Sequence, residues 1–452
     1  MRHHLLLLAL LSFLLIFQTS SSAQFSLPVF IDTLPTATVS QIASADFNQD
    51  GKEDLLTSNL NWPHDFMALY FNQGNEEFDF QSIPVADSLT NLESFAVGDI
   101  NKDDRMDFMV ATEFPSRLVW FENTLNGFIP HLLADSLDYT TQVLLADFDQ
   151  NGWLDVLALQ HVEIVVYLAI SDGLFRPGQV IHSGTEFYAI HANDFNADSI
   201  LDVAVASDGF EILLNDGTGH FTLHSAAGLA LTFGLQSADL DADYDMDIAA
   251  YMALQGILFF ENDGQGQFTF RESILESGDT FLEYVLQDLN CDHTIDLYTS
   301  IPQLGKMVLV VNAGQGEFTH LDEIHTQSGE LVAAVTTGDI NGDSIPDVIW
   351  GNRTLGLNLN ECEYVSVSPS YDRSLAIEIY PNPTSSTTAL FNPNDFELRY
   401  ALVDATGRTI ERNQKLLAHT SAACALPYPG LFVITFTNEM GDFITNEILI
   451  RL

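Results

Sequence analysis

The segment DFNQDGKED, residues 46–54, places side-chain oxygens at its positions 1, 3, 5 and 9. A glycine at position 6 permits a sharp turn, so alternate side chains can point inward around a hard cation. The backbone carbonyl of position 7 would supply one more oxygen. Asp and Asn also favour turns through local hydrogen bonds, so one copy alone would not establish a metal site.

The same nine-residue pattern occurs seven times, and its first aspartates lie 53, 48, 47, 45, 49 and 51 residues apart. A period near 40–50 residues is typical of a propeller blade of four strands. We therefore predict up to seven structural Ca²⁺ ions. Their expected ligands, with position 7 contributing its carbonyl, are Asp46, Asn48, Asp50, Lys52 and Asp54; Asp99, Asn101, Asp103, Arg105 and Asp107; Asp147, Asp149, Asn151, Trp153 and Asp155; Asp194, Asn196, Asp198, Ile200 and Asp202; Asp239, Asp241, Asp243, Asp245 and Asp247; Asp288, Asn290, Asp292, Thr294 and Asp296; and Asp339, Asn341, Asp343, Ile345 and Asp347.

The flanks of these loops exclude an EF-hand array. An EF-hand needs an acidic residue at position 12 and a helix on each side. Position 12 is never acidic here, and flanks such as Val39–Ala45 and Asp54–Leu60 are short, apolar and bounded by turn residues. Such segments are typical of β-strands, so we expect each loop to join two strands.

Each repeat shows the same order of elements. A strand leads into the loop and a second strand follows it. A third strand ends at an Asn-x-Gly-x-Gly-x-Phe turn, as at 215–221, 262–268 and 312–318 and more loosely at 72–78. A fourth strand begins at the Phe. Four antiparallel strands form a blade, and the sequence therefore predicts an all-β, seven-bladed β-propeller over residues 24–360.

The two ends of this region are complementary. The last repeat ends at Asn360 without a fourth strand, whereas Phe25–Leu34 resembles a fourth strand without predecessors. We expect Phe25–Leu34 to complete the last blade, which would close the ring and leave no unpaired edge.

These loops and turns resemble FG-GAP/VCBS repeats, which also form the propeller head of integrin α-subunits. The resemblance implies a seven-bladed propeller with calcium between the first two strands of each blade. Only Gly51 and Gly152 fill position 6; elsewhere it is Asp104, Ser199, Tyr244, His293 or Ser344. Since Tyr and Ser adopt left-handed geometry less readily, we expect the fourth, fifth and seventh sites to bind more weakly.

The N-terminus and the charge indicate export. Residues 1–23 read as a signal peptide: Arg2 is basic, Leu5–Phe17 is apolar but too short for a bilayer, and a small-residue cleavage site precedes Gln24. No later stretch is apolar enough for a transmembrane helix. The formal net charge is −48, with 63 acidic and 15 basic residues, which disfavours nucleic acid and anionic membranes as partners.

Three cysteines, Cys291, Cys362 and Cys424, are too few for a disulfide scaffold or a zinc cluster. Cys291 occupies position 4 of the sixth loop and should point away from the ion. Cys362 and Cys424 could pair in an oxidising compartment or remain free.

The C-terminal region has a different composition. Residues 361–373 read as a linker, and 374–452 as a small β-sandwich with strands at Ala376–Tyr380, Leu398–Val403, Leu431–Phe436 and Phe443–Ile450. The motifs YPNP at 380–383, DATGR at 404–408 and PGLF at 429–432 resemble the C-terminal sorting domain of bacterial type IX secretion cargo, with Phe432 in place of the usual Tyr. The resemblance implies passage across the outer membrane by the type IX machinery, with release or attachment at the cell surface.

The sequence favours a binding protein over an enzyme. It has no His-Glu-x-x-His pair, Gly-x-Ser-x-Gly elbow or phosphate-binding glycine loop, so we assign no catalytic residues. We predict adhesion to an extracellular protein or glycan ligand. The alternative is a propeller-type polysaccharide lyase or glycoside hydrolase, because two carboxylates that meet only in space leave no sequence pattern.

Strand direction locates the expected ligand face. In an up-and-down blade the metal loops and Asn-Gly turns share one rim, which leaves the opposite rim for ligands. Aromatic side chains there would suit sugar or protein recognition, although they could instead pack between blades. The residues assigned to this face are Trp62, His64, Phe114, Arg117, His161, Tyr188, Phe233 and Phe281.

Overall fold

The computed structural model divides into two compact units, Met1–Tyr364 and Val365–Leu452. The residues that it describes are 25–34, 36–61, 65–83, 90–275, 283–301, 306–324, 332–362, 378–380, 387–391, 398–404, 409–416, 421–425, 430–437 and 443–451. The predicted signal peptide and most of the predicted linker lie outside these ranges. Within them every regular element is a β-strand, and no helix that could span a membrane was found.

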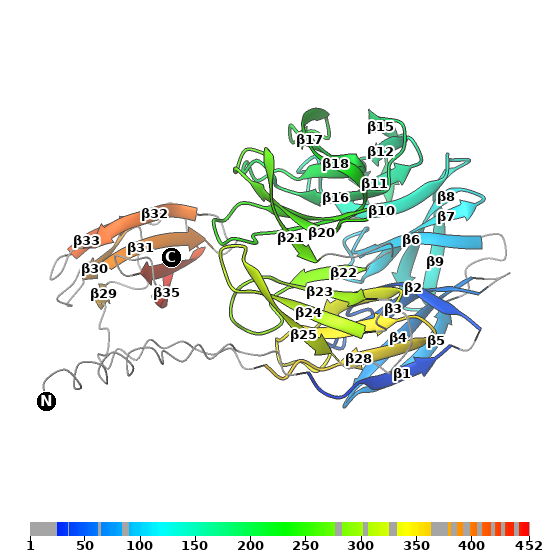
Figure 1. Ribbon diagram of the computed structural model, residues 1–452, viewed down its shortest axis with the longest axis horizontal. Helices are drawn as coiled ribbons and strands as arrows, with labels where there is room; N and C mark the ends of the chain where they lie inside the picture. The colour runs from blue at the N-terminus through cyan, green and yellow to red at the C-terminus, as the bar shows by residue number, and fades with distance from the viewer. Residues whose placement is uncertain are drawn as a thin grey trace, which may run out of the picture. The chain divides into compact units, whose positions relative to one another are not determined.

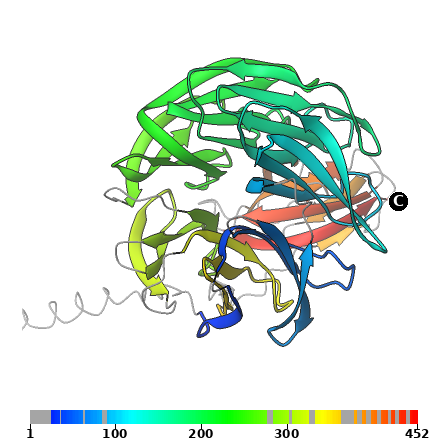
Figure 2. The same cartoon turned by 90° about the vertical axis from the view of Figure 1, so that its right-hand side faces the viewer.

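The first unit is a β-propeller whose antiparallel sheets lie around a common centre (Figure 2). Five of its sheets have four strands, in the orders β2-β3-β4-β5, β6-β7-β8-β9, β10-β11-β12-β15, β22-β23-β24-β25 and β1-β28-β27-β26 (Figure 1). Their strands are β1 (Val29–Thr33), β2 (Thr38–Ala45), β3 (Asp54–Leu60), β4 (Phe66–Gly74), β5 (Glu77–Ile83), β6 (Thr90–Gly98), β7 (Asp107–Phe114), β8 (Arg117–Thr124), β9 (Gly127–Asp135), β10 (Thr140–Ala146), β11 (Asp155–Gln160), β12 (Glu163–Tyr167), β15 (Gln179–Ser183), β22 (Tyr284–Gln287), β23 (Asp296–Ile301), β24 (Lys306–Asn312), β25 (Phe318–Ile324), β26 (Ala334–Gly338), β27 (Asp347–Gly351) and β28 (Thr354–Asn358). A small hairpin, β13 (Ala169–Ser171) and β14 (Leu174–Phe175), follows β12.

The prediction of seven four-stranded blades is wrong, because the fourth and fifth repeats share one six-stranded sheet. Its strands, in order, are β16 (Ala189–Asn193), β17 (Asp202–Asn215), β18 (Phe221–Ala238), β19 (Asp247–Met252), β20 (Gly256–Asn262) and β21 (Phe268–Leu275).

Two glycines explain the merger. Gly209 and Gly228 have φ values of 100° and 79°, which glycine adopts without steric cost. They bend β17 and β18 while strand pairing continues on both sides. The first half of β17 pairs with β16 and its second half with β18; likewise β18 pairs first with β17 and then with β19. Two turns are therefore absorbed into the strands: one within the fourth repeat, at Gly209, and the one that would separate the fourth and fifth repeats, at Gly228.

Strand starts follow the sequence pattern closely. The aspartate at position 9 of every loop is the first residue of a strand, namely of β3, β7, β11, β17, β19, β23 and β27. The predicted phenylalanine starts of fourth strands are found at Phe221, Phe268 and Phe318. The expectation that the loops join strands is confirmed.

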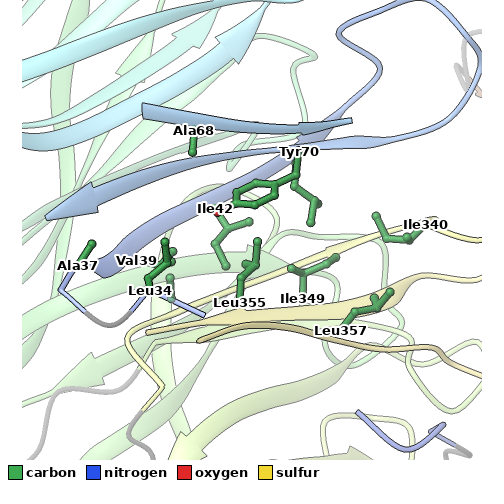
Figure 3. Packing of buried hydrophobic residues seen from close by; sticks show 12 residues of the cluster. Leu34, Ala37, Val39, Ile42, Ala68, Tyr70, Ile340, Ile349, Leu355 and Leu357 are labelled. Carbon is green, nitrogen blue, oxygen red and sulfur yellow. The ribbon is translucent and has the colours of Figure 1, made fainter. Parts of the chain in front are cut away.

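The N-terminal strand closes the ring, as predicted. β1 pairs antiparallel with β28, with Val29 opposite Leu357 and Thr33 opposite Thr354. The closing interface is apolar: side chains of the first repeat, including Val39 and Ile42, face side chains of the last repeat, including Ile349 (Figure 3).

Buried asparagines link neighbouring repeats around the ring. In six repeats an asparagine Nδ2 donates to the carbonyl oxygen at position 2 of the preceding repeat's loop. The pairs are Asn72 to Ile340 (2.8 Å), Asn123 to Phe47 (2.8 Å), Asn215 to Phe148 (2.7 Å), Asn262 to Phe195 (2.9 Å), Asn312 to Leu240 (2.7 Å) and Asn360 to Leu289 (3.0 Å). We call these contacts the asparagine links. The third repeat has Ala169 at this place, identified by its backbone N–H donating to Asp155.

Asn72→Ala is expected to destabilise the propeller by about 2–4 kcal/mol, because it breaks the link that joins the first repeat to the last and leaves buried carbonyls without a donor. Asn72 is fully buried, and its Nδ2 also donates to the Glu53 carbonyl. Chemical denaturation monitored by circular dichroism would measure the loss. Asn126→Ala, in an exposed turn, is the matched control, and equal stability of the two variants would contradict the expectation.

A disulfide joins Cys291 to Cys362, with 6.0 Å between their Cα atoms. Both alternatives left open by the sequence are therefore wrong for Cys362, which neither pairs with Cys424 nor remains free. The asparagine link from Asn360 to Leu289 brings the end of the propeller beside the sixth loop, which places the two cysteines together although they are 71 residues apart.

The second unit contains two antiparallel sheets, ordered β29-β30-β33 and β32-β31-β34-β35. The strands are β29 (Glu378–Tyr380), β30 (Thr387–Phe391), β31 (Leu398–Asp404), β32 (Thr409–Leu416), β33 (Ser421–Ala425), β34 (Gly430–Thr437) and β35 (Phe443–Arg451). All four strands predicted here are present. Most residues of the three sorting-type motifs lie outside the described residues.

Candidate metal loops and channel pocket

All seven loops have the same backbone fold. The position-1 carboxylate accepts hydrogen bonds from the backbone N–H groups of positions 5 and 6, as Asp46 does from Asp50 (3.1 Å) and Gly51 (2.8 Å). Positions 4 and 6 have positive φ in every copy, and Tyr244 at position 6 has φ 76°. The turn thus forms whatever residue occupies position 6.

Position 7 is also fixed in the same way throughout. The backbone N–H of each residue there donates to the side chain at position 5, as Lys52 does to Asp50 (3.0 Å). The same bond recurs at Arg105, Trp153, Ile200, Asp245, Thr294 and Ile345.

The position-9 aspartates hold the loops in place through hydrogen bonds to the backbone. Asp54 is fully buried, and its two oxygens accept from the backbone N–H groups of Phe47 (3.0 Å) and Asn72 (2.8 Å). Burial raises the pKa of Asp54 to about 6 and that of Asp296 to about 8. Since each carboxylate oxygen has a second lone pair, these side chains can also face a cation, whose charge would favour their ionised form.

Position 3 separates the loops into two kinds. Five have Asn, and in four of these its Nδ2 donates to the carboxylate at position 5, as Asn48 does to Asp50 (3.3 Å). The third and fifth loops have Asp149 and Asp241 instead. An asparagine there supplies a donor within the loop, whereas an aspartate adds a negative charge.

The third and fifth loops fit a hard cation best. Asp147, Asp149 and Asp155 bring carboxylate oxygens within 4.8 Å of one another, and so do the aspartates at 239, 241 and 247. The Oδ1 atoms of Asp149 and Asp241 are buried without a hydrogen-bond partner, and a buried anionic oxygen needs a positive partner. Among the described residues no other such group converges, and the expected weakness of the fifth site therefore finds no support in its geometry.

The two favoured loops differ in charge. Arg271 Nη1 lies 3.2 Å from Asp241 Oδ2 and 2.6 Å from Glu261 Oε2. An arginine therefore already offsets part of the negative charge of the fifth loop. The aspartates of the third loop have no such arginine partner among the described ion pairs, so a cation would offset more negative charge there than in the fifth loop.

The predicted ligand face is only partly brought together. Tyr188 and Phe233 pack edge to face, with ring centroids 5.1 Å apart. Arg117 pairs instead with Asp135 (3.2 Å), and exposed His161 lies 3.9 Å from Glu186. Trp62, His64 and Phe281 lie outside the described residues, as does the side chain of Phe114.

Tyr188 and Phe233 line a cavity of about 450 Å³, which we call the channel pocket. Its walls come from β2, β6, β10, β18, β22 and β26 and from 188–190, thus from the strand that precedes each of the seven loops. The lining residues lie toward the start of these strands, away from the loops that follow their ends. The pocket therefore lies in the half of the ring opposite the metal loops.

Sequence reasoning missed the acids of this pocket. Glu93 and Glu283 line it. Burial raises the pKa of both to about 7, and in Glu93 a hydrogen bond with Glu113 adds to the effect. The only signal in the sequence is a glutamate within an otherwise apolar or small-residue inner strand, as in Leu92-Glu93-Ser94.

Glu283→Gln is expected to stabilise the protein at pH 8 by about 1–3 kcal/mol and to have little effect near pH 4. The folded-state pKa of about 7 lies above the usual 4.5, so the folded protein binds the extra proton and loses stability as pH rises from 4.5 through 7. Glutamine removes that loss. Thermal melts across this pH range measure it, with exposed Glu77→Gln as control; a pH-independent difference would contradict it.

A β-propeller built from acidic loop repeats is the class of protein that this fold and these sites define. Residues 46–110, 147–205 and 288–350 match the family model of the FG-GAP-like repeat. Each match begins at the first aspartate of one loop and includes the next loop. The chain therefore contains FG-GAP-like repeats. No curated protein sequence matches it.

Solved structures share the fold at low sequence identity. BBS1N in complex with ARL6DN, soaked with lead, has a TM-score of 0.52 at 12% identity, covering 75% of this chain and 96% of that chain. An Agrocybe aegerita lectin that recognises non-reducing terminal N-acetylglucosamine has a TM-score of 0.47 at 19% identity, covering 64% and 80%. YCF48 from Cyanidioschyzon merolae has a TM-score of 0.49 at 8% identity, covering 74% and 98%.

Proposed function

We propose that this chain is an exported, calcium-stabilised propeller that binds an extracellular protein or glycan. The observation that carries the binding role is the channel pocket, which is lined by residues from all seven repeats, aromatic and acidic ones among them, and lies away from the metal loops. Small-molecule and ligand sites are typically cavities of about 300–1,000 Å³ with a few convergent polar groups. The fold shared with BBS1N, which was solved in complex with ARL6DN, supports a protein ligand.

Calcium is proposed as a structural ion. The buried Oδ1 atoms of Asp149 and Asp241, each within a group of three carboxylates, support this role. Ca²⁺ favours oxygen ligands of this kind. It would remove the repulsion within each loop and hold together the two strands that the loop joins.

Export by a type IX route is proposed from the sequence, with the N-terminal signal segment and the three C-terminal motifs as its support. The Cys291–Cys362 disulfide adds support, because disulfides persist in extracytoplasmic compartments. The two C-terminal sheets would then pack as the sorting sandwich, and the protein would be secreted or attached to the cell surface.

The test is binding of the purified propeller to arrays of extracellular glycans and proteins in calcium buffer. Phe233→Ala and Tyr188→Ala should reduce the signal of any bound ligand by about tenfold or more. Tyr244→Ala replaces an exposed aromatic at the metal-loop rim and should leave binding unchanged. Binding that survives both pocket substitutions would place the ligand elsewhere and refute the assignment.

The rival function is a propeller-type polysaccharide lyase or glycoside hydrolase. It is favoured by Glu93 and Glu283, since a carboxyl group with a pKa near 7 can serve as a general acid or base. Incubation with acidic and neutral glycans, followed by analysis of chain length, separates the two. Products that disappear in Glu283→Gln would establish the enzyme, whereas binding without products supports the binding module.

A further inference from the structure

The channel pocket contains acids without basic counterparts. Glu93 and Glu283 line it, Glu113 is hydrogen-bonded to Glu93, and the charge of Asp65 also acts on Glu93. None of the described lining residues is Lys, Arg or His. The negative charge of the channel pocket is therefore not neutralised by any of its described lining residues.

Aromatic rings line the same pocket as these acids. Phe233 packs against Tyr188 and also lies 6.0 Å, centroid to centroid, from Tyr251. The hydroxyl of Tyr284 is occupied, since it donates to the Ala249 carbonyl (2.7 Å). Ring faces attract organic cations through their quadrupole, most strongly where water is excluded.

The neutral polar groups of the pocket are largely occupied. Gln41 bonds both to the carbonyl oxygen and to the N–H of Phe95 (2.9 Å each), and Gln142 does the same with Ile190 (3.0 and 2.8 Å). Gln236 links to the Tyr284 carbonyl and to the Leu286 N–H. These glutamines thus hold neighbouring inner strands together, and in each of them the amide oxygen and one of the two amide N–H donors are already used.

The charged groups that the pocket offers to a ligand are acceptors. The carboxylates of Glu93 and Glu283 only accept hydrogen bonds when ionised. The hydroxyl of Thr141 also lines the pocket and is buried without a partner. A ligand rich in donors and positively charged matches this set better than a neutral one.

A bare metal ion does not match it. Among the described residues, three acidic ligand atoms converge within 4.8 Å only in the third and fifth loops, and not in this pocket. An ammonium group needs fewer carboxylates and gains from neighbouring rings.

We propose that the channel pocket binds its ligand through an ammonium group, with Glu283 and Glu93 as counter-charges and Phe233 and Tyr188 as ring contacts. The inference rests on the proposed ligand-binding function and names the chemical class that this site selects. The cavity of about 450 Å³ accommodates a small amine or an ammonium-bearing end of a larger ligand.

Binding should strengthen as pH rises through about 7. Both carboxyl groups have a pKa near 7 and must ionise to pair with the cation. The charges of Glu113 and Asp65, both acidic, raise the pKa of Glu93. The charge of Glu93 in turn raises the pKa of the Tyr139 phenol. Glu283 has the phenol of Tyr284 beside it. A quaternary ammonium keeps its charge across this range, so the pH effect would report on the protein.

The experiment is isothermal titration calorimetry of the full chain in calcium buffer with choline, and with 3,3-dimethylbutan-1-ol, which has the same shape without the charge. Choline should bind saturably at pH 8 and more than about tenfold more weakly at pH 6, and the neutral alcohol should bind at least about tenfold more weakly than choline at pH 8. Glu283→Gln and Phe233→Ala should each weaken choline binding by about tenfold. Exposed Glu77→Gln should not change it.

Three outcomes would overturn the inference: no saturable choline binding, equal affinity for the two probes, or full affinity in Glu283→Gln. Thermal melts of each variant show that it folds, and Glu283→Gln should not melt lower than the parent protein at pH 8. The proposed function fails separately. If the glycan and protein arrays give ligands whose binding depends on Phe233 while choline does not bind, the binding role stands and ammonium selectivity is wrong.

Discussion

Chelation of calcium by EDTA is expected to lower the free energy of unfolding of the propeller, and with all seven loops occupied the loss would exceed that of any single substitution considered above. A site with a dissociation constant of about 0.1 mM contributes about 1.4 kcal/mol at about 1 mM calcium. Occupancy of all seven loops would therefore contribute about 10 kcal/mol, and occupancy of the third and fifth alone about 3 kcal/mol. Denaturant titration with and without EDTA measures the total and so reports how many loops bind.

The position-3 aspartates supply a sharper form of this experiment. Asp149→Asn with Asp241→Asn gives these loops the side chain that the other five have. If only the third and fifth loops bind, EDTA should no longer affect the double variant; if all seven bind, most of the effect should remain. Asp79→Asn on the exposed face of β5 is the control. If EDTA leaves the free energy of unfolding of the parent protein unchanged, calcium has no structural role.

Removal of the disulfide is expected to cost about 4 kcal/mol. The bond between Cys291 and Cys362 closes a loop of 71 residues, and in the chain-entropy account a crosslink of this span restricts the unfolded chain by about that amount. It also holds the end of the propeller against the sixth loop, where both sulfur-bearing side chains are buried. The variant with Cys291→Ser and Cys362→Ser should melt at a lower temperature than the parent protein.

Reduction by dithiothreitol distinguishes the effect of losing the disulfide from any other effect of the two serine substitutions. Reduction should destabilise the parent protein but not the double serine variant. Cys424→Ser is the matched control and should behave like the parent, because its thiol is the one that the disulfide does not use. A parent protein that is insensitive to reduction would contradict the prediction.

The sequence predicted the fold well where local chemistry decides it. The position-9 aspartates start strands because each carboxylate accepts from one backbone N–H within its loop and from another on the third strand of the repeat, as Asp54 does from Phe47 and Asn72. The blade count was wrong because Gly209 and Gly228 lie inside continuous strands. Whether a glycine ends a strand or bends it depends on the pairing partners, which lie far away in the chain.

The sites were predictable only in part. The distinction between Asn48 and Asp149 is visible in the sequence, but its meaning depends on whether the side chain bonds within its own loop. The channel pocket gathers single residues from all seven repeats, such as Glu93 and Glu283, and no local pattern connects them. The Cys291–Cys362 pairing likewise follows from closure of the ring.

One junction of the described ring, between the second and third repeats, lacks an asparagine link. Ala169 cannot donate the hydrogen bond that an asparagine supplies at every other junction, so the second and third repeats lack a link worth about 1–3 kcal/mol. At the same junction Lys102 lies 4.4 Å from the centre of the Trp153 ring, a contact worth only about 0.5–1 kcal/mol at an exposed site. Mechanical or thermal opening of the closed circle should begin there, and circular permutants with new termini between β9 and β10 should be the best tolerated.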